Sequence, residues 1–127
     1  MLNTSDDRIV LDLPMFGGRV MLVRTYSEWN AAVTELKGDD ASHNLIEEDS
    51  HLGCEVRIAK SDTCPITTFL VGVYDGTRRT LLHELSHATF DICGYYGIPT
   101  DAGDANEFYA YCIEHLFHNL FRYFKVF

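Results

Sequence analysis

The segment Thr80–Gly94, TLLHELSHATFDICG, carries two histidines and a glutamate at the spacing HExxH. Residues four positions apart on an α-helix lie one above the other, so His83 and His87 would point the same way and could hold one cation. Glu84 is turned about 100° from His83, which places its carboxylate near enough to take a proton from a metal-activated water. This spacing therefore predicts a zinc site with its own general base.

Two histidines leave such a site incomplete, because a catalytic zinc ion usually has three protein ligands and one open position. The longer motif HExxHxxGxxH is absent, since Phe90 stands where its glycine belongs. We expect the third ligand from later in the chain, and Glu107 is the preferred residue. Asp104, His115 and Asp101 are the alternatives. Glu107 also has a purely structural explanation, as a first-turn acid favoured by the helix dipole.

Two neighbouring side chains could assist the site. Asp91, one turn after His87, could orient an imidazole, or it could be a solvated helix residue. Tyr111, one turn beyond Glu107, could donate a hydrogen bond to an oxyanion, or it could pack in the core like many aromatic residues. Tyr111 is therefore a candidate catalytic residue beside Glu84.

The elements that must position this helix predict an α+β fold in a single domain, 1–127. The runs RIVLDL and GRVMLVRT are typical of two strands joined through PMFGG, and TYSEWNAAVTELKG has helical spacing, with Ser27 as its N-cap and Gly38 as its end. CEVRIAK alternates apolar and polar residues, whereas ITTFLVGVY is almost uniformly apolar. They predict a half-buried strand and a more central one.

The chemistry-bearing helix follows that central strand directly. Asp75 or Thr77 can cap its start, and Gly94 is the expected end. The stripe Leu81, Leu85, Ala88 and Ile92 should pack against the sheet. We therefore expect a twisted, mostly antiparallel sheet packed on the N-terminal helix and the HExxH helix. A long C-terminal helix would carry the third ligand.

Composition narrows the classes of function. The chain has 127 residues and a net charge of −9, which argues against a nucleic-acid partner because phosphate binding needs clustered Lys and Arg. No apolar run is long enough to span a bilayer and no secretory signal is visible, so we expect no membrane association and a cytoplasmic location. His43 and His51 lie in a polar, acidic loop and are expected to be solvated. The four cysteines are expected to be reduced.

The HELSH core and the downstream NEFYAYCIEHLF together resemble a minimal zincin of the gluzincin type, similar to short HExxH proteins of phage and bacterial genomes. The resemblance covers 67–120. It implies that His83, His87 and Glu107 bind Zn²⁺ and that Glu84 is the general base. For a phage-encoded protein the location would be the host cytoplasm.

Two functions follow as hypotheses. The first is a zinc-dependent metallopeptidase that hydrolyses peptide bonds of a protein or peptide substrate, which would lie extended along an edge strand of the sheet. The loop 94–106 would border the cleft. The second is a zincin-fold interaction protein, catalytically weak or inactive, with a structural metal site. An intact Glu84 favours the enzyme, because a structural site has no use for a base.

Overall fold

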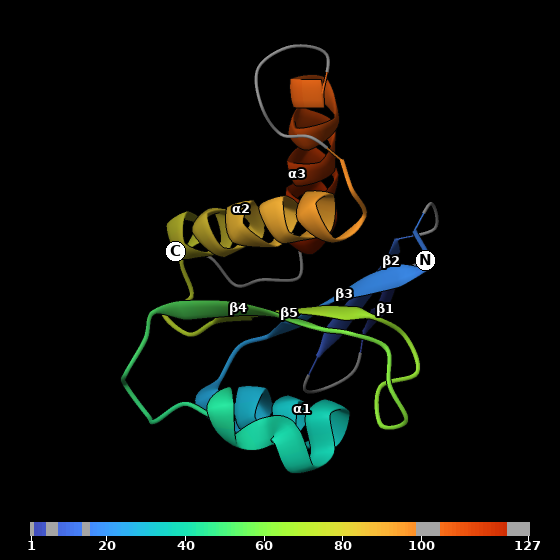
Figure 1. The fold of residues 1–127 in the computed structure, drawn as a ribbon. Coiled ribbons are helices and arrows are strands. Elements are labelled where there is room, and N and C mark those ends of the chain that lie inside the picture. The colour runs from blue at the N-terminus through green and yellow to red at the C-terminus, as the bar shows by residue number, and fades with distance from the viewer. Residues whose placement is uncertain (1, 5–7, 14–15, 99–104, 122–127) are drawn as a thin grey trace.

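The computed structural model describes residues 2–4, 8–13, 16–98 and 105–121. They form an α+β fold in which a five-stranded sheet separates one helix, α1, from two others, α2 and α3 (Figure 1). The elements in chain order are β1 Leu2–Thr4, β2 Ile9–Leu13, β3 Gly18–Val23, α1 Tyr26–Lys37, a 3₁₀ helix Gly38–His43, β4 Gly53–Ile58, β5 Thr68–Val73, α2 Arg78–Tyr95 and α3 Ala105–Phe121. The predicted α+β class is confirmed.

The strands lie in the order β1-β2-β3-β5-β4, so β1 and β4 are the edges. Among the described strands, three neighbouring pairs are antiparallel and β3 with β5 is parallel, which gives a mixed and mostly antiparallel sheet. Every residue of β5 is buried because strands flank it on both sides and helices cover both faces. Its uniformly apolar sequence is therefore that of an interior strand.

Helix α1 covers one face of the sheet through Trp29, Ala32, Val33 and Leu36, all buried. Its N-cap is Thr25 and not Ser27, because the Thr25 side chain accepts a hydrogen bond from the Glu28 amide while Tyr26 already has helical geometry. Gly38 ends the helix as predicted, with a φ of 59° that favours glycine.

Helix α2 lies on the opposite face. Thr77 caps its start by accepting from the Thr80 amide, which confirms one of the two predicted caps. The stripe Leu81, Leu85, Ala88 and Ile92 is fully buried against the sheet, as predicted. The predicted end at Gly94 is wrong, since α2 runs on to Tyr95. The chain reverses only at Gly97, whose φ of 72° suits a residue without a side chain.

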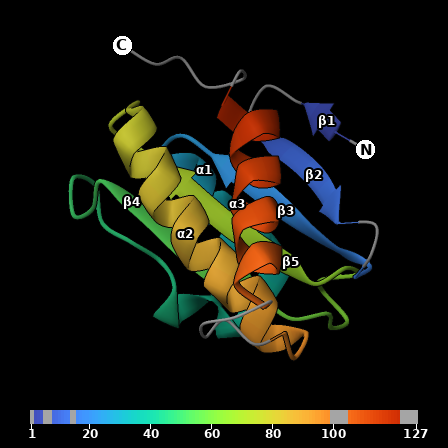
Figure 2. The same cartoon turned by 90° about the horizontal axis from the view of Figure 1, so that it is seen from above.

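Helix α3 packs on α2 at a steep angle (Figure 1) and runs in roughly the opposite direction when seen from above (Figure 2). Phe90 of α2 stacks near Tyr109, with ring centroids 4.6 Å apart, and the Arg78 guanidinium lies 5.7 Å from the Phe121 ring. Tyr109, in the first half of α3, therefore lies near the second half of α2, and Phe121, its last residue, lies near the start of α2. Among the described helices, none is both long and apolar enough to span a membrane. All four cysteines are free thiols.

Candidate functional site

The two motif histidines form a pair of converging imidazoles on the exposed face of α2. Their Nε2 atoms are 3.2 Å apart, and the rings meet at 77° with centroids 4.8 Å apart. Zinc–imidazole bonds are about 2.0–2.1 Å long, so two nitrogens at this separation would subtend about 100° at a shared ion, close to the tetrahedral angle. His83 and His87 therefore fit the donor pair that a zinc ion requires.

Glu84 lies on the adjacent face of the helix and is only 8% exposed. Burial raises the pKa of its carboxyl, and the imidazoles of His83 and His87 act in the opposite direction. A carboxylate that is partly desolvated beside a cation site holds a proton more readily than one in water, which is the property that a general base needs near neutral pH.

The position of Glu84 depends on Gly53, the first residue of the edge strand β4. A Cβ atom at Gly53 would lie 2.8 Å from the Glu84 Cγ, 2.7 Å from the Thr80 Cγ2 and 2.8 Å from the Gly72 carbonyl oxygen. No real Cβ tolerates contacts this short. Glycine at this position therefore lets the edge strand approach the motif helix closely.

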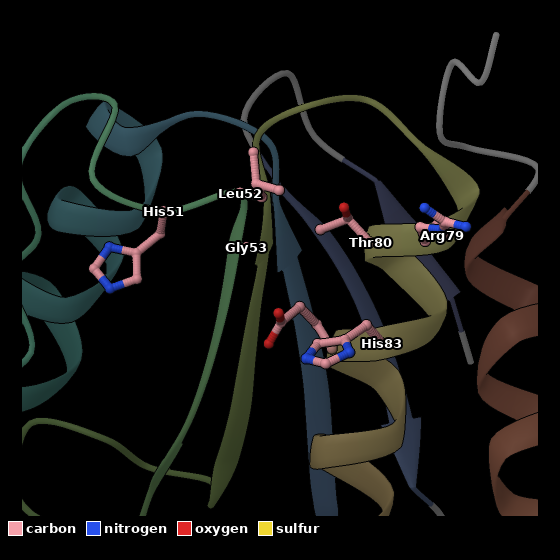
Figure 3. A pocket seen from close by; sticks show the side chains of 7 residues that line it. His51, Leu52, Gly53, Arg79, Thr80 and His83 are labelled. Carbon is pink, nitrogen blue, oxygen red and sulfur yellow. The ribbon is translucent and has the colours of Figure 1, made fainter.

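A pocket of about 280 Å³ opens between β4 and the first turns of α2 (Figure 3). Its lining consists of His51, Leu52, Gly53, Arg79, Thr80, His83 and Glu84. The structure therefore brings His83 and Glu84 to one cavity, as the sequence predicts, and adds a wall from the segment just before β4.

His51 belongs to that wall. Figure 3 shows it across the pocket from His83, and it adds to the effects that lower the pKa of Glu84. Its backbone is anchored where the Tyr26 hydroxyl donates to the His51 carbonyl oxygen at 2.6 Å. His51 is exposed, as expected, yet it lines the site, a placement that sequence reasoning missed. A histidine just before the edge strand could have signalled it only if the strand order were known.

Farther along the helix, a cluster of charged residues joins α2 to β4. We call Glu55, Arg57 and Asp91 the charged seam. Arg57 donates to the Asp91 carboxylate at 2.8 Å, and Glu55 lies within hydrogen-bonding reach of the same carboxylate. Burial, followed by Asp91 and then Glu84, raises the pKa of Glu55 to about 8. Asp91 thus braces the helix against the edge strand.

The predicted third ligand is not assembled in this structure. Glu107 is exposed in the first turn of α3, two residues before Tyr109, whose ring lies against Phe90 of α2. Within the described ranges, no group of three or more His, Cys, Asp or Glu side chains is gathered for a metal ion. Ligation by Glu107 therefore stays a prediction.

The alternatives to Glu107 remain equally open. His115 is exposed on α3 beside Asn119, whose amide donates to the His115 carbonyl oxygen. Asp101 and Asp104 lie outside the described residues. Tyr111 is 66% exposed, so it is not the core residue of the competing explanation, and its role as an oxyanion donor stays a prediction.

Comparisons of the chain with protein families, with curated proteins and with solved structures give no match. A functional assignment therefore has to come from the chemistry of the site. That chemistry consists of two converging imidazoles, a buried carboxylate beside them and a pocket bounded by an edge strand.

Proposed function

We propose that this chain is a metal-dependent peptidase of the zincin type, which hydrolyses peptide bonds of a protein or peptide substrate. The observation that carries the proposal is the 3.2 Å separation of the His83 and His87 Nε2 atoms beside the buried Glu84. A helix that needed histidines only for solvation would have no reason to aim both rings at one point next to a desolvated acid.

His83 and His87 would hold the metal, with Glu107 as the preferred third ligand. When bound, Zn²⁺ would polarise the scissile carbonyl and make a water molecule acidic enough to lose a proton near neutral pH. The fit of the imidazole pair to zinc supports this metal, although two imidazoles and a carboxylate also suit other divalent ions.

The protein's own contribution to the chemistry would centre on Glu84. Its carboxylate would accept the proton of the attacking water and pass it to the leaving amine. The raised pKa of Glu84 favours the first transfer, because a more basic carboxylate accepts the proton of the attacking water more readily. The carboxylic acid so formed is still far more acidic than a protonated amine, so it can pass the proton on to the leaving group. The close approach of Gly53 would keep the carboxylate in one position during these steps.

The substrate would bind along the edge strand β4. This strand ends the sheet of the described residues, where one row of its backbone groups has no strand partner, and an extended peptide could pair with it. Strand β4 also lies directly beside the motif helix, where Gly53 packs against Thr80 and Glu84. A peptide paired with β4 would therefore pass over the pocket.

A second function is an interaction protein of the same fold with a structural metal site. The observation that favours it is the absence of a third ligand among the described residues. A site with two histidines alone binds zinc more weakly than a complete catalytic site. This alternative predicts metal binding or partner binding without hydrolysis.

The substitution Glu84→Gln separates the two functions. Metal content and hydrolysis of a denatured protein mixture would be measured for the wild type, for Glu84→Gln and for Glu48→Gln, an exposed control. The peptidase predicts that Glu84→Gln keeps its zinc and loses about 10²–10⁴-fold in rate, as expected for a general base, while the control is unchanged. A zinc-loaded wild type that cleaves nothing would rule out the peptidase and favour the interaction protein.

A further inference from the structure

Arg79 lies on the same exposed stripe of α2 as the two motif histidines. It precedes His83 by four positions, as His83 precedes His87, so the three side chains follow one another at successive turns of the helix. Arg79 also lines the pocket together with His83 and Glu84 (Figure 3). Arg79 therefore lies one turn before His83, at the end of the candidate catalytic centre where α2 begins.

This guanidinium has no acidic partner among the residues that the structure describes. Other arginines are engaged: Arg8 pairs with Glu35, Arg57 with Asp91, and Arg78 lies over the Phe121 ring. The nearest acid in sequence before Arg79 is Asp75, and its two oxygens accept hydrogen bonds from the Thr77 and Thr80 hydroxyls.

The charge of the pocket differs from that of the whole chain. The protein carries a net charge of −9, yet the pocket lining contains one arginine, two histidines and a single acid, Glu84. An unpaired cation kept in an otherwise acidic protein is suited to an anionic group of a ligand.

We propose that Arg79 anchors a carboxylate of the substrate close to the scissile bond. Four helical residues rise about 6 Å, which an extended peptide covers in about two residues. The carboxylate would therefore belong to a residue within about two positions of the bond that is cleaved. It would be either an acidic side chain or the free C-terminus, since both offer the planar pair of oxygens that arginine binds.

This inference rests on the proposed function, because only a peptidase has a scissile bond. The binding of the carboxylate can nevertheless be tested without hydrolysis. The probes are three small peptides: N-acetyl-Ala-Glu-amide, N-acetyl-Ala-Ala with a free C-terminus, and N-acetyl-Ala-Ala-amide. Each would be titrated into the full chain, treated with a chelator, while NMR follows the arginine Nε–H signals and the backbone amides of the pocket. We expect at least fivefold tighter binding of one or both carboxylate probes than of the amide.

The variants make the test specific. Arg79→Gln should abolish the preference for a carboxylate, and Arg79→Lys should keep part of it, because lysine supplies the charge without the paired donors. Arg78→Gln is the matched control, since Arg78 is the adjacent cation and lies over Phe121. Comparison of the affinities of the first and second peptides shows whether Arg79 binds an acidic side chain or a free C-terminus.

Equal binding of all three probes, or a preference that survives in Arg79→Gln, would overturn the proposal. A preference that appears only after zinc is added, and persists in Arg79→Gln, would also overturn it by assigning the carboxylate to the metal. The outcomes are separable from those of the peptidase test. If Arg79 binds the carboxylate but the protein hydrolyses no peptide, the role of Arg79 stands and the peptidase is refuted. If the protein hydrolyses peptides without preferring a carboxylate, the peptidase stands and the role of Arg79 is refuted.

Discussion

The two halves of the boundary between α2 and β4 use similar residues in opposite ways. In the second half, Asp91 pairs with Arg57 and lies within hydrogen-bonding reach of Glu55, and Arg57 also lies 4.8 Å from the Tyr95 ring. In the first half, Arg79 has no acidic partner among the described residues, and the Nε2 atoms of the two imidazoles lie 3.2 Å from each other. Charges that are paired hold the helix to the strand, whereas charges left open beside a pocket are available to a ligand. The following changes test that division, beginning with the largest expected effect.

His87→Ala should lower the zinc affinity at least 100-fold, because it removes one of the two imidazoles that converge at 3.2 Å. Loss of groups that merely support a ligand already costs about 10–100-fold. The affinity would be measured by competition with a zinc chelator of known strength. His43→Ala, in the 3₁₀ helix far from α2 in sequence, is the control and should bind zinc as the wild type does. Equal affinities of the two variants would refute the metal site.

Gly53→Ala should destabilise the fold by about 1–3 kcal/mol, the usual cost of overpacking. The added methyl group would lie within 3 Å of Thr80, Glu84 and the Gly72 carbonyl. Chemical denaturation would measure the change in the free energy of unfolding.

Gly94→Ala is the matched control for Gly53→Ala, because a Cβ at this helical position meets nothing within 4 Å. It should be neutral or stabilise the protein by up to about 1 kcal/mol, since alanine has the higher helix propensity. A Gly53→Ala protein as stable as Gly94→Ala would show that the strand does not approach the helix this closely.

Glu55→Gln should change how stability depends on pH. The pKa of Glu55 is about 8 in the folded protein against about 4.5 for a free carboxyl, so the folded state binds the proton more tightly. The free energy of unfolding should therefore fall as pH rises from about 4.5 through 8. After allowance for partial exposure, the loss should be about 2 kcal/mol.

In Glu55→Gln, position 55 no longer carries an ionisable group. The variant should therefore match the stability of the wild type near pH 5 and exceed it at pH 8.5. Urea denaturation at both pH values measures this difference. Glu48→Gln, in the exposed loop, should follow the wild type at both. If the free energy of unfolding of Glu55→Gln depends on pH as that of the wild type does, the raised pKa does not belong to Glu55.

Arg57→Gln should have the smallest effect, about 0.5–1 kcal/mol, because its ion pair with Asp91 is partly exposed to water. The measurement is again the free energy of unfolding, at low and at high salt. A loss that persists unchanged in high salt would indicate packing on Tyr95 as the source of stability, in place of the ion pair.

Patterns within one element were predictable. The buried stripe of α2, the Thr77 cap and the interior character of β5 all follow from local periodicity and composition, and the structure confirms them. The predictions that were wrong, the Ser27 cap and the end at Gly94, concern boundaries where neighbouring residues compete for the same role.

The placement of the two imidazoles on one helix face could be predicted from the sequence alone. A helix has a fixed rise and turn, which set two residues four positions apart on the same face. Tertiary structure decided what surrounds the pair. The strand order made β4 an edge beside α2, and that placement brought Gly53 against Glu84, His51 to the pocket and Arg57 to Asp91. Likewise, the packing of α3 on α2 decided that Tyr109, two residues after Glu107, lies against Phe90. Contacts between residues that are distant in sequence cannot be predicted from the periodicity of one element. They depend on how whole helices and strands bury their apolar faces against one another.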